Sequence, residues 1–257
     1  MKILVLAGTA DGRHIAEELH SRGFSVYATT VTEYGSKLFA EGLRVLVGAL
    51  SLDELKGLLV EKEIEAIVDA THPFARDISL IAMQACEAMG LKYIRYERAK
   101  DPGSVGGYVV RAKDYDRAEK VLSEFDNIFL TIGSKNLDKF VHFLHRGKKL
   151  VARVLPDSTV IQRCEELGFG PDSIIAMKGP FSTDMNKMMF KEWGAKIVVT
   201  KDSGPAGGVI EKIEAAKDLR IPVILLERPD LNYHNIARNM RDILVLLSGE
   251  ELNTKAW

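Results

Sequence analysis

The sequence of 257 residues contains little cysteine and no long hydrophobic run. Its two cysteines, Cys86 and Cys164, lie far apart in segments of helical periodicity, which excludes a disulfide framework and a zinc-binding pattern. No segment approaches the roughly 20 apolar residues that a membrane-spanning helix requires. The apolar run at the amino terminus spans only about six residues before a glycine-rich turn, so we interpret it as a first strand and not as a signal peptide. We therefore expect a cytoplasmic protein with no membrane partner and no metal.

The sequence also lacks an excess of charge of either sign. Lysine and arginine together number 35 and aspartate and glutamate 36, which gives a net charge of −1. This balance produces no overall field that would attract nucleic acid or an anionic membrane, so we expect neither as a partner. A polyanionic ligand would have to bind to a local cluster of basic side chains. The hydrophobic content of 46% in a chain of this length is enough for a sizeable core.

Short apolar runs alternate with amphipathic segments along the chain. The runs span about four to six residues and are rich in β-branched residues, which is typical of strands in a parallel sheet covered on both faces. The expected strands are 2–7, 25–30, 44–47, 65–70, 92–95, 127–132, 149–154, 173–176, 196–200 and 222–226. The expected helices are 12–22, 33–41, 51–60, 75–90, 113–124, 136–145, 157–167, 183–192, 207–219 and 233–247. This alternation predicts an α/β fold with parallel sheets.

The alternation is interrupted over residues 97–112, where a proline and several glycines occur without helical periodicity. We interpret residues 101–112 as a crossover between two Rossmann-like lobes, formed by residues 1–100 and 113–257, with a cleft between them. In open α/β sheets, ligands bind outside the carboxyl ends of the strands. The residues that follow each expected strand are therefore the candidate site residues.

Two strand ends in the first lobe suit a nucleotide. The segment Gly8–Arg13 joins the first strand to a helix, where glycine lets the backbone approach a phosphate and the helix start offers amides. Its spacing is not G-x-G-x-x-G, so a tight turn that merely requires glycine is the alternative. The second strand ends in Thr29 and Thr30, without the acidic residue that holds the ribose 2′-hydroxyl of NAD, which favours NADP.

The fourth strand ends in a turn that concentrates polar groups, Asp69–Ala75. We expect Pro73 at the first helical position, with Thr71 or His72 before it as the cap. The turn is interpreted either as a cofactor or substrate contact or as capping and loop packing. His72 could donate a proton, although a lone histidine is more often structural.

Basic and glycine-rich segments follow the strands of the second lobe. They include Gly133–Lys135, Lys178–Ser182 and Lys201–Gly208. The last of these places a lysine, a serine and three glycines before a helix, which predicts an anion-binding loop; a flexible loop is the alternative. It is not a P-loop, because the lysine precedes the glycines. Arg228 follows the last strand and could bind a carboxylate in bidentate fashion.

Together these segments resemble the precorrin-6A reductase family. The matching motifs are Gly8-Thr9-Ala10-Asp11-Gly12-Arg13, Asp69-Ala70-Thr71-His72-Pro73-Phe74-Ala75, Gly179-Pro180-Phe181-Ser182, Thr200-Lys201-Asp202-Ser203-Gly204 through Gly208-x-x-Glu211-Lys212, and Ile221-Pro222-Val223 with Arg228-Pro229. They occur in the family's order and together are specific. Ala7 and Asp11 stand where the family usually has glycine and glutamate, and both differences leave the loop chemistry intact.

The resemblance implies an enzyme of corrin (vitamin B12) biosynthesis that uses NADPH to reduce one ring double bond of a tetrapyrrole, (cobalt-)precorrin-6A, to (cobalt-)precorrin-6B. It also implies two Rossmann-like lobes with the site between them. The substrate carries many carboxylates around an apolar ring, so we expect basic residues around it. The charged helices suit a monomer, and we expect that state. The expected catalytic residues are Lys201, Ser203 and His72, with Lys201 as charge stabiliser or proton source.

The expected cofactor-binding residues are Gly8, Thr9, Ala10, Asp11, Gly12, Arg13, Thr29, Thr30, Thr71, Pro73, Phe74 and Gly133. The expected substrate-binding residues are Arg76, Lys135, Lys178, Gly179, Ser182, Gly204, Gly207, Gly208 and Arg228. Two other functions stay open at this point. Nucleotide-sugar glycosyltransferases share two Rossmann-like lobes without sharing the chemistry, and a non-catalytic sensor would bind NADPH without turnover. NADPH binding, compared with NADH, and NADPH consumption with a precorrin distinguish the three.

Overall fold

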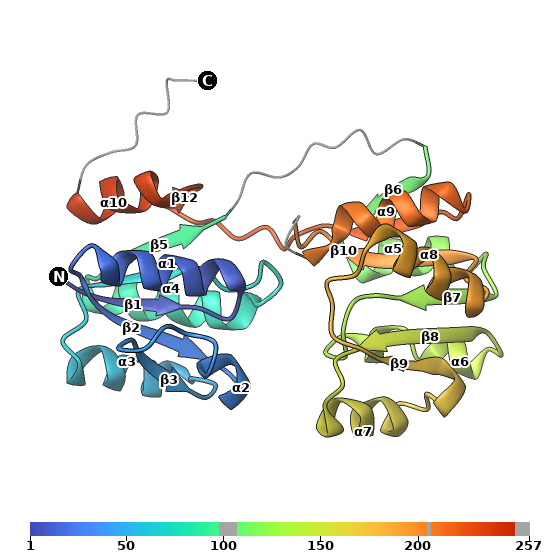
Figure 1. Cartoon of the computed structure of the whole chain (residues 1–257), viewed down its shortest axis with the longest axis horizontal. Coiled ribbons are helices and arrows are strands. Elements are labelled where there is room, and N and C mark those ends of the chain that lie inside the picture. Colours follow the sequence, from blue (N-terminus) through green and yellow to red (C-terminus); the bar gives the residue numbers. More distant parts are fainter. Residues whose placement is uncertain (98–106, 205–206, 250–257) are drawn as a thin grey trace. The chain divides into compact units, whose positions relative to one another are not determined.

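The computed structural model describes residues 1–97, 107–204 and 207–249, which form two compact α/β units. The first unit contains the described residues up to Glu97 and those from Pro229 onward, and the second contains Gly107 to Arg228 (Figure 1). The predicted assignment of all of residues 113–257 to the second lobe is therefore corrected, because the chain returns to the first unit after Arg228. Part of the predicted crossover, residues 101–106, lies outside the described residues.

The sheet of the first unit consists of parallel strands in the order β12-β5-β4-β1-β2-β3. Its strands are β1 (Lys2–Leu6), β2 (Ser25–Thr30), β3 (Arg44–Val47), β4 (Ala66–Asp69), β5 (Lys92–Tyr96) and β12 (Ile236–Ala237). The first five confirm the predicted strands, whereas β12 lies within the predicted helix 233–247. The strand order reverses direction between β1 and β4, which makes this pair the topological switch point where ligands bind in such folds.

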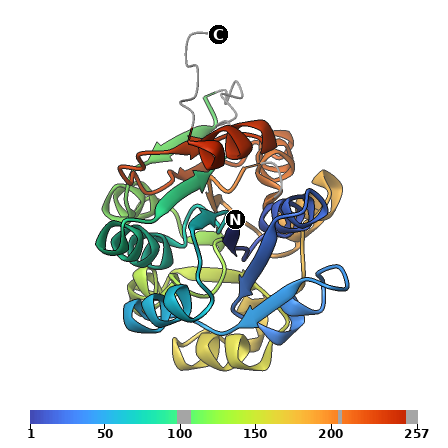
Figure 2. The same cartoon turned by 90° about the vertical axis from the view of Figure 1, so that its left-hand side faces the viewer.

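Helices cover both faces of this sheet (Figure 1 and Figure 2). They are α1 (Ala10–Ser21), α2 (Glu33–Ser36), α3 (Leu52–Glu61), α4 (Arg76–Met89) and α10 (Met240–Ser248). Buried residues of α1 and α10 pack on one face and those of α3 and α4 on the other. Ser51 and Glu54 form a capping box at the start of α3, since each accepts a hydrogen bond from the other's backbone amide. The predicted helix 33–41 is only four residues long, with Gly35, a poor helix former, inside it.

The second unit repeats this strand order. Its parallel sheet runs β6-β11-β10-β7-β8-β9, so that β7 and β10 form its switch point. Its strands are β6 (Val109–Ala112), β7 (Asn127–Leu130), β8 (Lys149–Val154), β9 (Ile174–Ala176), β10 (Ile197–Lys201) and β11 (Val223–Leu226). Five of them confirm predicted strands, and β6 lies in the segment assigned to the crossover.

The helices of the second unit are α5 (Tyr115–Leu122), α6 (His142–His145), α7 (Ser158–Glu166), α8 (Thr183–Glu192) and α9 (Val209–Asp218). The predicted helix 136–145 is divided into a 3₁₀ turn, Leu137–Lys139, and the single turn of α6. Residues of α8 and α9 pack on one face of the sheet, where Phe190 lies edge-on to Phe129 with ring centroids 5.0 Å apart. This packing fixes α8 and α9 side by side on the same face of the sheet.

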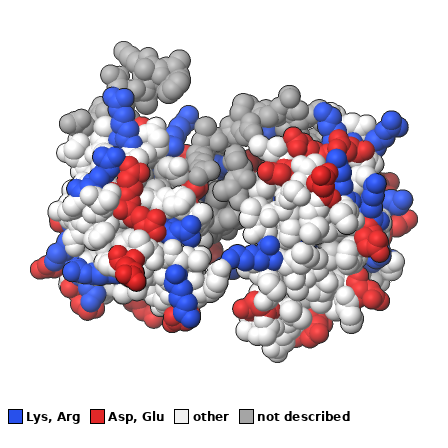
Figure 3. Space-filling model, in the orientation of Figure 1, with Lys and Arg blue, Asp and Glu red and all other residues white. Residues whose placement is uncertain are grey.

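Within the described residues, no helix is both long and apolar enough to cross a membrane. The same residues contain no group of three or more potential metal ligands. Acidic and basic side chains are interspersed over the visible face of each unit, as the near-zero net charge leads one to expect (Figure 3).

Candidate functional site

The turns after β1 and β4 are joined directly at the switch point of the first unit. Thr9 caps α1, and its hydroxyl accepts a hydrogen bond from the Gly12 amide at 3.0 Å. The same hydroxyl donates to the carbonyl of Ala70 at 2.8 Å. The sequence predicted both turns as cofactor contacts, and the structure places them side by side.

Gly8 and Gly12 have different roles in the first turn. A Cβ at Gly12 would lie 2.6 Å from the Cα of Ala7, so α1 starts in close contact with the end of β1 only because residue 12 has no side chain. Gly8 is exposed, and a Cβ there would meet nothing within 4 Å. The turn is therefore open on the side where a ligand would approach the start of α1. A pyrophosphate fits this arrangement, because a helix start presents amides and a positive dipole end.

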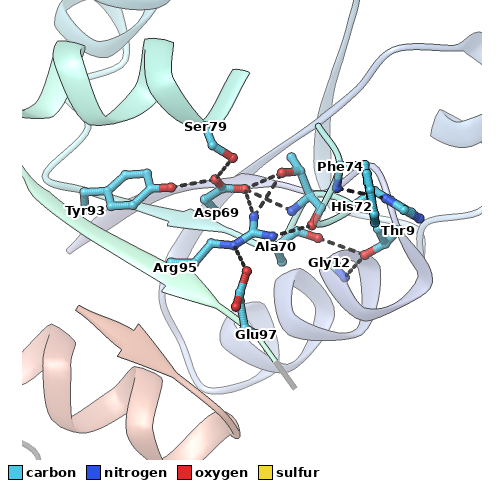
Figure 4. Close-up of polar contacts among 11 residues, drawn as sticks. Thr9, Gly12, Asp69, Ala70, His72, Phe74, Ser79, Tyr93, Arg95 and Glu97 are labelled. Carbon is cyan, nitrogen blue, oxygen red and sulfur yellow. Dashed lines mark hydrogen bonds and ion pairs between the residues drawn. The ribbon is translucent and has the colours of Figure 1, made fainter. Parts of the chain in front are cut away.

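A buried ionic network supports the turn after β4 (Figure 4). Asp69 is fully buried and accepts hydrogen bonds from Ser79 Oγ and Tyr93 Oη, both at 2.6 Å, and from Arg95 Nη1 at 2.9 Å. The Thr71 hydroxyl and amide donate to it as well, at 2.6 and 3.0 Å. Burial, together with the charge of Asp69, raises the pKa of the Tyr93 phenol, so this group stays protonated as a donor.

Arg95 completes the support of the Thr71 turn. Its side chain is 1% exposed and donates to the Thr71 carbonyl at 3.2 Å and to Glu97 Oε1 at 3.2 Å. The Tyr233 ring packs against the guanidinium at 5.3 Å. Asp69 and Arg95 are thus occupied with each other and with the backbone, and their effect on a ligand at this turn is indirect.

The residues above this network form a turn and not the start of a helix. The Phe74 amide donates to His72 Nδ1 at 3.2 Å, so a neutral His72 carries its proton on Nε2. The Ala75 amide donates to the His72 carbonyl at 2.7 Å, and α4 begins only at Arg76. The prediction that Pro73 occupies the first helical position is therefore wrong, since the chain turns once more before the helix.

Thr29 and Thr30 end β2 almost completely buried, at 8% and 7% exposure. A Cβ at Gly35 would lie 2.3 Å from Thr30 Oγ1, so α2 covers this threonine closely. The acidic residue nearest to the strand end in sequence is Glu33, at the start of α2. A preference for NADP at this strand end stays a prediction.

The switch point of the second unit brings two lysines together. Lys201 ends β10 and lies near Lys135, which follows β7. Burial, and secondarily the charge of Lys135, lower the pKa of Lys201 to about 8. An amine with such a pKa can release or take up a proton near neutral pH. The role of Lys201 as proton source or charge stabiliser stays a prediction.

Glycines lie at both described ends of the loop after β10. Gly204 and Gly208 adopt positive φ angles of 75° and 64°. A Cβ at Gly207 would lie 1.9 Å from Ser203 Oγ, so the loop closes only with glycine there. Arg228 reaches back into the same loop, where its Nε donates to the Asp202 carbonyl at 3.0 Å.

The other predicted residues of the second unit lie at its carboxyl edge. Ser182 caps α8 by accepting a hydrogen bond from the Met185 amide at 3.2 Å. Lys178 and Gly179 are exposed in the turn after β9, and Gly133 follows β7 with a φ of 72°. The candidates therefore fall into two groups. Arg76 and His72 belong to the first unit, and Lys201 and Ser203 belong to the second.

Sequence reasoning did not predict that four charged side chains are buried. Arg95, Asp69, Arg153 and Lys212 are each at most 9% exposed. The sequence did contain a signal for Arg153. It lies inside an apolar strand (KLVARV), where burial of an arginine is costly, so an arginine there indicates a function. The pairing of Asp69 with Arg95 depends on the register of β4 against β5, which places these residues opposite one another.

Two parallel sheets of identical core order, with glycine-rich and polar turns at each switch point, define an α/β protein with two Rossmann-like units. The chain belongs to the family described as precorrin-6x reductase CbiJ/CobK, whose family model matches residues 2–248. The resemblance inferred from the motifs is thereby confirmed.

Proteins named cobalt-precorrin-6A reductase match nearly the full chain. The one from Priestia megaterium is 35% identical and covers 94% of this chain and 96% of its own. The one from Methanothermobacter thermautotrophicus is 37% identical, with 95% and 82% covered. A solved structure named CobK precorrin-6A reductase superimposes with a TM-score of 0.79 over 97% of each chain at 24% identity, which confirms the fold.

Proposed function

We propose that this protein is an NADPH-dependent reductase that converts precorrin-6A or its cobalt form to the corresponding precorrin-6B. Membership of the family over residues 2–248 supports the tetrapyrrole substrate. The observation that carries the coenzyme assignment is the open turn at Gly8, linked through Thr9 to the turn after β4. This is the place and chemistry at which α/β sheets bind dinucleotides.

When bound, NADPH would supply the hydride for one carbon of the ring double bond, and a proton must reach the neighbouring carbon. In the first unit, the start of α1 would hold the pyrophosphate, and the Thr71–Phe74 turn would contact the coenzyme. In the second unit, Lys201 would provide positive charge or the proton, because burial holds its pKa at about 8. The glycine-rich loop behind Lys201 would close on the substrate.

We further propose that the protein works as a monomer in the cytoplasm. Cys86 and Cys164 are both buried free thiols. Burial raises the pKa of Cys86 to about 12, so this thiol stays protonated and unreactive, as suits a reducing compartment.

The test is NADPH consumption by the purified protein with precorrin-6A and with cobalt-precorrin-6A, and NADH is the matched control coenzyme. We expect turnover with NADPH and much weaker turnover with NADH. A Lys201→Ala variant should lose kcat while it still binds NADPH. No affinity for NADPH would overturn the proposal, and binding without consumption would indicate a sensor. Unchanged kcat and KM in Lys201→Ala would remove Lys201 from the mechanism.

A further inference from the structure

Two cations are buried near each other in the second unit, with less acidic charge beside them than their own positive charge. Arg153, on β8, is 7% exposed and Lys212, on α9, is 9% exposed. Within the described part of the chain, neither forms an ion pair with a carboxylate within 4.0 Å. Burial lowers the pKa of both, and the charge of Arg153 lowers that of Lys212 further, to about 8. Such an arrangement is unfavourable in the empty protein.

Both side chains are held in place by neutral groups, and each keeps N–H groups that could donate to a further acceptor. Arg153 Nη1 donates to Asn186 Oδ1 at 2.8 Å and contacts Met189 Sδ at 3.3 Å. The guanidinium lies 4.4 Å from the centroid of the Phe181 ring. Among the described residues, both hydrogen bonds of the guanidinium start from Nη1, which leaves the edge formed by Nε and Nη2 for an acceptor; this edge can bind a carboxylate in bidentate fashion.

Lys212 lies under the glycine-rich loop. Its Nζ donates to the Gly207 carbonyl at 2.6 Å, which leaves two of its three N–H groups for other acceptors among the described residues. The charge of Glu211, whose Oε2 is buried, raises the pKa of Lys212, but this one carboxylate does not neutralise Arg153 as well. The pair therefore keeps an excess positive charge.

The surroundings of the pair belong to two loops that the sequence assigned to the substrate. Asn186, which holds Arg153, also donates to the carbonyls of Phe181 and Ser182 at 3.2 and 2.9 Å. A Cβ at Gly208 would lie 3.7 Å from Pro180, so the loop after β9 lies against the loop after β10. An anion bound to Arg153 and Lys212 would bridge these loops.

We propose that Arg153 and Lys212 form a subsite that binds one peripheral carboxylate of the tetrapyrrole substrate. The inference rests on the proposed function, because that function supplies a substrate fringed with carboxylates. Arg153 would bind the carboxylate through its Nε and Nη2 edge and Lys212 through Nζ. The bound anion would then supply the negative charge that the chain itself does not.

The test compares Lys212→Met and Arg153→Lys with the wild type in three measurements: KM for the tetrapyrrole, Kd for NADPH by fluorescence, and the thermal unfolding midpoint. Lys217→Met is the matched control, since Lys217 is exposed on the same helix. We expect KM to rise about tenfold or more in Lys212→Met, with NADPH affinity unchanged. The unfolding midpoint should stay equal or rise, because a repulsive buried charge is removed. A purely structural lysine would lower the midpoint instead.

The double variant provides an internal check. If both residues bind the same carboxylate, its KM should rise by less than the product of the two single effects. Unchanged KM in both single variants would overturn the subsite. A rise in Kd for NADPH would also overturn it, since the anion would then be a coenzyme phosphate. Failure of the proposed function is distinguishable, because the wild type itself would then show no turnover.

Discussion

At the scale of single residues, the two units differ in how their buried charges are compensated. In the first unit, Asp69 and Arg95 neutralise each other, and five donors converge on the carboxylate. Removal of one partner from such a pair is strongly destabilising, because the other charge is left buried alone. In the second unit, Arg153 and Lys212 repel each other. The first arrangement shapes a turn, and the second is suited to receive an anion.

The pH dependence of turnover follows from the lowered pKa of Lys201. Below about 8 the amine is charged and can donate a proton or stabilise charge, and above that pH it is neutral. We expect kcat, measured with saturating substrates, to fall as the pH rises through about 8. Saturation separates this effect from Lys212, which would act on substrate binding. In Lys201→Arg the fall should be absent over this range, because arginine stays charged.

Stability should respond in the opposite direction to activity. The folded pKa of Lys201 lies below the ordinary value of 10.5, so the unfolded chain binds more protons between about 8 and 10.5. The contribution of this lysine to the free energy of unfolding therefore rises over that window.

The activity prediction has its own contrary outcome. A kcat that stays constant up to pH 10 would contradict the assigned role of Lys201.

At the scale of the elements, the sequence predicts the strands well for a physical reason. A strand covered on both faces is mainly apolar, and the ten strands that were predicted are short runs in which apolar residues predominate. The two strands that it missed are sheet edges. Residues of β6 follow a glycine-rich segment that obscures them, and β12 has only two residues. Helix starts are less predictable, as Pro73 shows, because a turn and a first helical residue use the same residue types.

The close contact between α1 and β1 predicts the effect of a single methyl group. In Gly12→Ala the new Cβ would lie 2.6 Å from Ala7 Cα, so the helix must move away from the strand. We expect a loss of about 1–3 kcal/mol in the free energy of unfolding and weaker NADPH binding, because the Thr9 turn moves with the helix. Urea unfolding and NADPH titration measure the two effects.

Gly57→Ala is the matched control for this prediction. Gly57 lies inside α3, and a Cβ there would meet nothing within 4 Å. The same methyl group should therefore stabilise the protein by about 0.5–1 kcal/mol, since alanine favours a helix. Equal stability of both variants would show that α1 does not depend on a glycine at its start.

At the scale of the whole molecule, the sequence could not reveal that the chain returns to its first unit. Periodicity reports which face of an element is buried, but not which sheet it joins. In the structure β12 pairs with β5, and α10 buries Ile243, Leu246 and Leu247 against the first sheet. The candidate site residues could be proposed from the sequence because they follow strands, whereas the buried network at Asp69 required the strand register.

The division into two units predicts which unit a core substitution destabilises. Ile243 is fully buried on α10, and truncation to alanine should cost about 2–5 kcal/mol in the first unit. Trp193 belongs to the second unit, and in a Trp257→Phe background it is the sole tryptophan. In Ile243→Ala we expect part of the circular dichroism transition to shift to lower urea, while the Trp193 fluorescence transition stays in place.

Leu122→Ala provides the mirrored case, because Leu122 is fully buried on α5 of the second unit. Its cavity should move the Trp193 transition and leave the remaining part of the dichroism transition unchanged. The two variants together distinguish separate unfolding of the units from unfolding of the chain as a whole. If Ile243→Ala shifts the Trp193 transition as far as Leu122→Ala does, the units unfold as one, and residues 229–249 stabilise more than the first sheet.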